Sequence, residues 1–305
     1  MNICVAQLTA NMFHYTSEQG VLGIFQKDKI VLQLTKADCM NDVSEGKEIF
    51  NYLEKVCKDL LSQKILNEGQ YSDILAIKDN FSTTLPVAYF LSGIKKSSID
   101  GEDNEEITDS YTSRFRSCDI YLMSFSKKND LLPMWNYYAT YGKQGYSIHF
   151  NGDQLSLLHE KKECYTEIVE VIYKDFQKYD IVKNIILSAL SQPDYLTRIQ
   201  DNLASYQYLF KNEAFEYEQE IRYLVGIPQK TEQKTFDIKF KTKNGSIIPY
   251  IELEFDNSRS FIVTGVTIGP FADVDLVQKN LQFYLEHQNH IASINIDTTN
   301  IPIRF

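Results

Sequence analysis

The sequence predicts an α+β protein in which a mixed, split β-sheet is flanked by helices. Two observations support this fold class. Segments with the two-residue alternation of strands occur near both ends of the 305-residue chain, and segments with helical spacing lie between them. Strands so far apart must share one sheet to bury their apolar faces. We therefore expect a single domain over residues 1–305, with helical additions at about 44–117 and 175–213 packed on one side of the sheet.

The composition is typical of an ordered, soluble protein of the cytoplasm. Hydrophobic residues make up 43% of the chain, and Tyr and Phe are abundant. The five cysteines are scattered, as in proteins of a reducing compartment. The N-terminus lacks the features of a secretory signal and no apolar run is long enough to span a bilayer, so we expect no membrane partner. The formal net charge of -10 disfavours tight binding to long duplex nucleic acid.

The first third of the chain predicts a strand, a short helix and a second strand over residues 12–34. Thr16 and Gln19 have the spacing of a capping box at the start of that helix. His14 and Tyr15 then lie at the end of the first strand, just ahead of a helix N-terminus, where backbone N–H groups face an anion. A longer amphipathic helix is predicted at 49–65.

The middle of the chain places two serines and an aromatic helix close together. A strand at 119–126 carries Ser124 and Ser126 on one face near its end. A short helix at 131–141 follows, with Trp135 and Tyr138 at helical spacing. The later elements are a strand at 146–150, another at 163–173, two helices within 175–213 broken near Pro193, strands at 236–240, 247–255 and 261–268, a helix at 274–287 and a strand at 293–296.

An acidic segment before these last strands is the most distinctive feature. At strand spacing one face holds Glu216, Glu218, Glu220 and Arg222. Such a row is either a solvated edge strand or a cleft that uses its charge. In the second interpretation Glu220 pairs with Arg222 as a support, Arg222 shares a cleft with His14, and Glu218 keeps its charge free to act on a developing cation. We therefore expect Glu218 to be the catalytic carboxylate.

Several common motifs are missing. The sequence has no phosphate-binding P-loop, no dinucleotide-binding glycine fingerprint, no HExxH and no GxSxG. His287 and His290 are interpreted as a surface pair, and no metal site is predicted. A nicotinamide ring needs an aromatic platform, its ribose needs hydroxyl or imidazole partners, and an oxocarbenium-like transition state needs a carboxylate. The candidate residues are His14, Tyr15, Ser124, Ser126, Trp135, Tyr138, Glu218, Glu220 and Arg222. Each also has a structural interpretation as a core residue or a backbone cap.

Eight short motifs resemble, in order, those of a bacterial family known as domain of unknown function 2971. They are HYTS (14–17), NDVSE (41–45), SFS with MWNYY (124–126 and 134–138), GYSIHF (145–150), EYEQEIR (216–222), IGP (268–270) and IPIRF (301–305). The family's strand–histidine–helix opening and its late glutamate strand resemble the ADP-ribosyltransferase fold. That resemblance implies NAD as co-substrate and an unidentified macromolecular target.

The same resemblance assigns roles to the candidate residues. It implies that His14 binds a ribose of NAD, that Ser124 and Ser126 match a serine-bearing strand, and that Tyr138 flanks the nicotinamide. Glu218 or Glu220 would catalyse the transfer. A toxin or phage-defence role is implied by the family's genomic associations. An NAD glycohydrolase and a non-catalytic module that binds a nucleotide, a nucleic acid or a protein partner are the alternatives.

Overall fold

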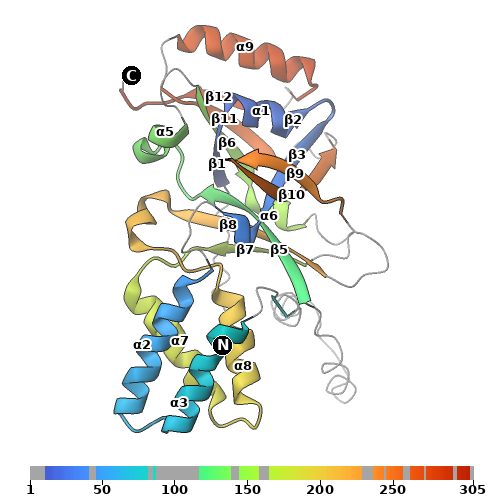
Figure 1. Cartoon of the computed structure of the whole chain (residues 1–305). Coiled ribbons are helices and arrows are strands. Elements are labelled where there is room, and N and C mark those ends of the chain that lie inside the picture. The colour runs from blue at the N-terminus through green and yellow to red at the C-terminus, as the bar shows by residue number, and fades with distance from the viewer. Residues whose placement is uncertain are drawn as a thin grey trace, which may run out of the picture.

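The computed structural model describes residues 11–40, 46–81, 85–86, 117–138, 144–157, 165–228, 236–243, 245–256, 262–270, 273–290 and 294–302. Within these ranges a mixed β-sheet lies between two groups of helices (Figure 1). The motif at 41–45, the end of the helix predicted at 131–141, and most of the motif at 301–305 fall outside the described residues.

The strands occur close to where the sequence predicts them. Their bounds are β1 Asn11–Ser17, β2 Phe25–Gln26, β3 Lys29–Lys36, β4 Leu85–Pro86, β5 Ser117–Ser126, β6 Gly145–Asn151, β7 Tyr165–Glu170, β8 Glu220–Pro228, β9 Lys239–Lys243, β10 Ser246–Asp256, β11 Val263–Ile268 and β12 Asn295–Thr298. The main path of the sheet is β12-β11-β6-β1-β5-β3-β10-β9, and β8 and β7 continue from β5. β11 and β12 pair in parallel, whereas the other named strand pairs are antiparallel. The mixed sheet flanked by helices is therefore confirmed.

The sheet opens along one edge of β5. β8 pairs with one edge of β5 over nearly its whole length, from Cys118 opposite Pro228 to Ser126 opposite Glu220. On the other edge, β3 pairs only at Tyr121 and Leu122, and β1 pairs only at Ser126. β1 and β3 therefore diverge from β5 between these points. The described strands nevertheless belong to one connected sheet, so the predicted split into two stays a prediction.

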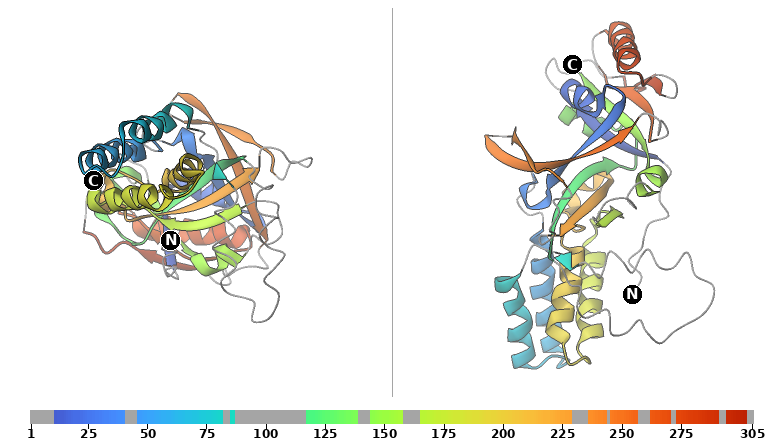
Figure 2. Two further views of the ribbon diagram at one scale, coloured as in Figure 1. Left: turned by 90° about the horizontal axis from the view of Figure 1, so that it is seen from below. Right: turned by 90° about the vertical axis from the view of Figure 1, so that its right-hand side faces the viewer.

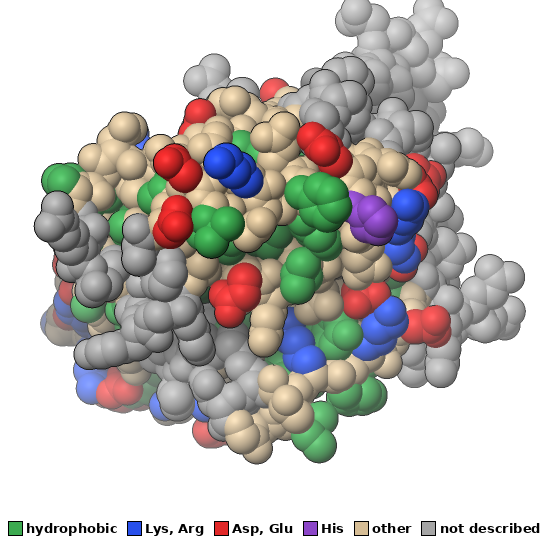
Figure 3. Space-filling model, turned by 90° about the horizontal axis from the view of Figure 1, so that it is seen from above, with side chains coloured by type: hydrophobic (Ala, Val, Ile, Leu, Met, Phe, Trp, Pro, Cys, Tyr) green, Lys and Arg blue, Asp and Glu red, His purple; other side chains and the backbone are tan. Residues whose placement is uncertain are grey.

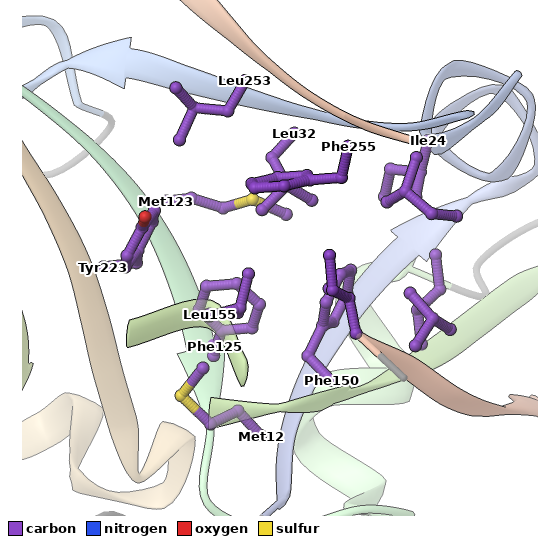
Figure 4. Close-up of a cluster of buried hydrophobic side chains, with 14 of the residues drawn as sticks. Met12, Ile24, Leu32, Met123, Phe125, Phe150, Leu155, Tyr223, Leu253 and Phe255 are labelled. Carbon is purple, nitrogen blue, oxygen red and sulfur yellow. The ribbon is translucent and has the colours of Figure 1, made fainter. Parts of the chain in front are cut away.

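One hydrophobic core fills the face of the sheet that lies toward α1 and α9. The close-up shows its central side chains, among them Met12, Leu32, Phe125, Phe150 and Phe255, pointing toward one another from β1, β3, β5, β6 and β10 (Figure 4). Successive side chains of a strand point to opposite faces, so every second residue of each strand contributes to this core. Burial of each such side chain stabilises the fold by about 1.5–3 kcal/mol.

A second core joins the sheet to a group of helices. α2, α3, α7 and α8 lie side by side below the sheet (Figures 1 and 2), and their apolar faces pack with Ile120, Leu122 and Leu224 on β5 and β8. The helices are α1 Glu18–Ile24, α2 Glu48–Ser62, α3 Glu68–Leu75, α5 Leu132–Tyr138, α6 Gly152–Leu157, α7 Asp175–Ala189, α8 Tyr195–Tyr206 and α9 Val274–His287, with short 3-10 turns η1 Ala37–Cys39, η2 Ala76–Asn80 and η4 Glu213–Glu218. The predicted break near Pro193 is confirmed. The single domain stays a prediction.

Two local predictions are wrong. The predicted capping box at Thr16 does not form, because β1 continues through Ser17 and the Ser17 side chain accepts the Gly20 N–H instead. The acidic segment is not one strand: residues 213–218 form η4, and β8 begins only at Glu220. Gln219 between them is left-handed (φ 45°), which breaks the strand spacing.

The outer surface around α9 has a mixed character. Hydrophobic, acidic and basic side chains are interspersed over the described part of this face (Figure 3). Leu276 and Phe283 of α9 are exposed. Within the ranges given above, we find no helix with the length and apolar character needed to cross a membrane.

Candidate functional site

A cleft of about 820 Å³ lies at the opening of the sheet. Its walls come from β1, α1, β3, β5, α5, η4 and β9, so segments far apart in the sequence meet there. The volume is within the range of about 300–1,000 Å³ that is typical of small-molecule sites. Seven of the candidate residues line the cleft. They are His14, Tyr15, Ser124, Ser126, Tyr138, Glu218 and Glu220.

Glu220 is the most tightly held carboxylate of the cleft. Its oxygens accept hydrogen bonds from Arg222 at 2.9 and 3.2 Å, from Lys211 at 2.8 Å and from the Ser124 hydroxyl at 2.5 Å. Burial opposes its ionisation, but the charges of Arg222 and Lys211 outweigh burial and hold the pKa of Glu220 at about 2. Glu220 is therefore an anion at neutral pH, and the predicted Glu220–Arg222 pair is confirmed.

Glu218 lies at the edge of the same cluster and is more accessible. Its side chain is 20% exposed, compared with 4% for Glu220. The prediction that its charge is free is wrong, because the Lys211 ammonium lies 2.5 Å from Glu218 Oε2. Burial raises the pKa of Glu218, and Lys211 opposes that rise. Glu218 therefore takes up a proton more readily than Glu220.

Lys211 is the residue that sequence reasoning missed. It follows α8 and places one ammonium between the two carboxylates, with the ammonium nitrogen 5.1 Å from the centroid of the Phe215 ring. Two carboxylates raise the pKa of Lys211 in spite of its burial, so it stays charged. The sequence indicates such a residue only indirectly, because several carboxylates at close spacing need more than one cation to offset their charge.

Two candidate residues lie behind the cleft wall and do not line it. Arg222 is fully buried, and its guanidinium donates to Glu220 and to the Tyr208 carbonyl. The prediction that Arg222 shares a cleft with His14 is therefore wrong. Trp135 is also fully buried, and its indole N–H donates to Asp130 at 2.8 Å. Both residues support the site and are screened from a ligand.

His14 bridges the opening between β1 and β5. Its Nδ1 lies 2.9 Å from the Ser124 carbonyl oxygen. A carbonyl only accepts, so Nδ1 must donate, and in the neutral ring Nε2 remains as an acceptor. Burial lowers the pKa of His14 to about 4, although the bond to Ser124 opposes this, so the ring is neutral at physiological pH.

The aromatic and serine candidates have different surroundings. The Tyr15 hydroxyl is buried, donating to the Lys128 carbonyl and accepting from the Leu131 N–H. Ser126 Oγ accepts the Lys128 N–H, which agrees with a backbone-capping role. Tyr138 is 38% exposed and stacks on Tyr15 with centroids 6.3 Å apart. Burial and then the charges of both carboxylates raise the pKa of Tyr138.

The η4 turn is fastened from outside the cleft. Lys174 binds Glu213 at 2.8 Å and Glu216 at 2.6 Å. The Tyr217 hydroxyl lies 2.7 Å from that of Tyr137 on α5. Glu216 therefore belongs to a solvent-side cluster and is separated from Glu218, contrary to the predicted common face.

The described residues contain no cluster of three or more His, Cys, Asp or Glu side chains that could hold a metal ion. His287 is exposed, whereas His290 is buried and lies with Nε2 2.7 Å from the Gln26 carbonyl. The prediction of a surface pair is therefore wrong for His290, which holds the β2 turn.

The fold and site define a mixed α/β protein with a charged cleft in the opening of its sheet. Residues 134–223 match the model of a family described as protein of unknown function (DUF2971), which confirms the family resemblance drawn from the motifs. The matched segment carries Tyr138, Lys211, Glu218, Glu220 and Arg222. Neither the curated proteins nor the solved structures gave a match.

Proposed function

We propose that this protein is an NAD-dependent ADP-ribosyltransferase whose substrate binds in the cleft. The observation that carries the proposal is the accessible carboxylate of Glu218 beside the saturated carboxylate of Glu220. Cleavage of the bond between ribose and nicotinamide develops positive charge on the ribose, and a nearby carboxylate stabilises such a cation. The motif resemblance supports this reaction class, and with it a role as a cytoplasmic toxin or phage-defence effector.

The two carboxylates differ in their capacity for further contacts. A carboxylate offers about four acceptor positions, and four donors reach Glu220 from Arg222, Lys211 and Ser124. Among the described residues, Lys211 is the one hydrogen-bond or ion-pair partner of Glu218. Glu218 therefore keeps acceptor positions that can face a substrate, and we assign it the catalytic role with Glu220 as its support.

The remaining lining residues fit the parts of a dinucleotide. His14 Nε2 can accept a hydrogen bond from a ribose hydroxyl, because Nδ1 is committed to Ser124. The Tyr138 ring is partly exposed in the cleft that Glu218 and Glu220 also line, and it offers a flat face to a nicotinamide. The Ser124 hydroxyl donates to Glu220, and its oxygen can still accept from a ligand.

Binding without chemistry is the second candidate function. The observation that favours it is the charge balance of the cluster: Glu218 and Glu220 are matched by Lys211 and Arg222. A neutral cluster recognises a ligand without providing a strong field for a developing cation. An NAD glycohydrolase differs from the transferase only in using water as the acceptor.

One experiment separates these functions. The protein is incubated with a cell extract and NAD labelled in its adenylate phosphate, and both released nicotinamide and label on protein, RNA or DNA are measured. Label together with nicotinamide supports the transferase; nicotinamide alone supports the hydrolase. A rise in melting temperature with NAD but no product supports the binding module. Absence of all three effects overturns the proposal.

A matched control tests the assignment of Glu218. Glu213 lies on the same η4 turn, pairs with Lys174 and does not line the cleft. Glu218→Gln and Glu213→Gln therefore make the same chemical change on one element. The proposal expects loss of turnover in the first variant and wild-type turnover in the second.

A further inference from the structure

We propose that Lys211 is the positioning residue of this site, which holds the Glu218 carboxylate against the cleft in its charged form. The catalytic meaning of this inference rests on the proposed function, but the electrostatic part does not. Lys211 lines the cleft and contacts both Glu218 and Glu220. No pattern in the sequence assigns it a role.

One ammonium group bridges the two carboxylates on either side of Gln219. The left-handed conformation of Gln219 places Glu218 at the end of η4 and Glu220 at the start of β8. The Lys211 ammonium spans this turn, 2.5 Å from Glu218 Oε2 and 2.8 Å from Glu220 Oε2. Two carboxylates that share one cation avoid the repulsion that otherwise drives one of them to take up a proton.

Lys211 is anchored independently of η4. Phe210 forms a parallel bridge with Ile172. The Lys211 N–H donates to the Ile172 carbonyl at 3.2 Å, and the Ile172 N–H donates to the Leu209 carbonyl at 2.7 Å. The ammonium therefore projects from backbone fixed on the β7 side. The position of Lys211 therefore does not depend on η4, and Lys211 can fix the position of the Glu218 side chain.

Lys211 is the cation that contacts Glu218 within the part of the chain that the structure describes. The Arg222 guanidinium donates instead to Glu220 and to the Tyr208 carbonyl. The other ionisable groups that influence one another around this carboxyl are Glu220 of β8, Tyr138 of α5, Tyr217 of η4 and Tyr173 beyond β7. None of them supplies positive charge. The charge of Arg222 also lowers the pKa of Glu218, but less than Lys211 does. Without Lys211, burial and Glu220 favour the protonated form of Glu218 against Arg222 alone.

The consequence for turnover is a change in pH dependence. A protonated Glu218 carries no charge to stabilise a developing cation, so turnover needs the ionised form. An opposite charge at hydrogen-bond distance lowers a carboxyl pKa by about one to three units. We expect the acid limb of NAD turnover in Lys211→Met to move upward in pH by about that amount, and Lys211→Arg to restore the wild-type profile.

A second measurement reports on Glu218 whether or not NAD is turned over. The side-chain carboxyl carbons of glutamate are labelled with ¹³C, and the Glu218 resonance is identified by its loss in Glu218→Gln. Its titration is then followed in the wild type, Lys211→Met and Lys211→Gln, after melting curves confirm that each is folded. The inference expects Glu218 to titrate at higher pH in both neutral variants. If only one neutral variant folds, that variant decides.

The chain supplies a matched control for this measurement. Lys174 also lies between two glutamates, Glu213 and Glu216, and does not line the cleft. Lys174→Met should leave the Glu218 titration unchanged. A titration that does not move in the Lys211 variants, or that moves equally in Lys174→Met, overturns the inference. A moved titration without any NAD turnover keeps the role of Lys211 and refutes only the proposed reaction.

Discussion

Glu218 and Glu220 share a single ammonium group although they belong to different elements. The left-handed Gln219 turns the chain between them, and Lys211 closes the turn from outside. The two carboxylates therefore differ in their surroundings. Four donors reach Glu220, whereas Glu218 has one hydrogen-bonding partner among the described residues and a raised pKa.

Isosteric substitutions should separate the two carboxylates. Glu218→Gln is expected to reduce NAD turnover by about 100-fold or more, because it removes the charge that acts on the ribose. Its stability should match or exceed that of the wild type at pH 7, because burial disfavours the ionised form of Glu218. Glu220→Gln should lower stability by about 3 kcal/mol or more, since Arg222 is left buried without its counter-charge. Chemical denaturation and nicotinamide release measure the two effects; turnover lost only in Glu220→Gln would contradict the assignment.

Glu220 should also govern the loss of stability in acid. Its pKa is lowered from 4.5 to about 2 in the folded state. A carboxyl with a depressed folded pKa contributes stability that is present above the unfolded pKa and is lost as pH falls through the folded one. The window is therefore pH 4.5 to 2, and the loss is on the order of 3 kcal/mol. Denaturation between pH 7 and 2 should show this component in the wild type and lack it in Glu220→Gln.

His14 should act through its two ring nitrogens separately. His14→Asn places an amide donor near the position of Nδ1, keeping the bond to Ser124, and removes the Nε2 acceptor. We expect near wild-type stability and NAD binding weakened about tenfold, the effect of one lost hydrogen bond. His14→Phe removes both functions and should also lower stability. Calorimetric titration with NAD and thermal melting measure the difference; equal NAD affinity in His14→Asn and the wild type would exclude contact through Nε2.

The pH dependence of binding provides a further check on His14. The pKa of His14 is lowered to about 4, so the ring stays neutral throughout the neutral range. A base with a depressed folded pKa contributes stability above its unfolded value of 6.5, and this stability is lost as pH falls toward 4. Protonation of His14 should therefore cause no change in NAD affinity near pH 6.5, and the wild type and His14→Asn should show the same pH dependence of NAD affinity there. A change there that His14→Asn removes would mean that a ligand meets the protonated ring.

Much of the fold could be predicted because most elements bury one face. Met12, Phe125 and Phe150 mark the core side of their strands by simple alternation, and the break before α8 follows from Pro193. The η4 turn could not be predicted in this way. The spacing of its glutamates fits a strand. Two contacts stabilise the turn instead: the Asn212 side chain caps it, and the Gln219 carbonyl accepts a hydrogen bond from the Lys127 N–H.

The site was predictable where it depends on neighbours in sequence and not where it depends on tertiary contacts. The pairing of Glu220 with Arg222 follows from their spacing on one strand face. The position of Lys211 depends on the bridge between Phe210 and Ile172, which no local pattern indicates. The burial of Arg222 likewise depends on the helices that cover β8. The spacing of Arg222 on its strand alone suggests contact with a ligand, whereas in the structure Arg222 is buried and supports Glu220.

The α1 wall of the cleft offers a test of occupancy that leaves the charged cluster intact. Gly23 lines the cleft, and a Cβ added there meets no atom within 4 Å. Gly23→Ala should stabilise the protein by up to about 1 kcal/mol through helix propensity. Gly23→Phe should project into the cleft, leave the fold intact and weaken NAD binding at least tenfold. Gly20→Ala is the contrasting variant: its Cβ would collide with Thr16 Oγ1, so it should lower the melting temperature. If Gly23→Phe folds and binds NAD as tightly as the wild type, the ligand does not lie against α1.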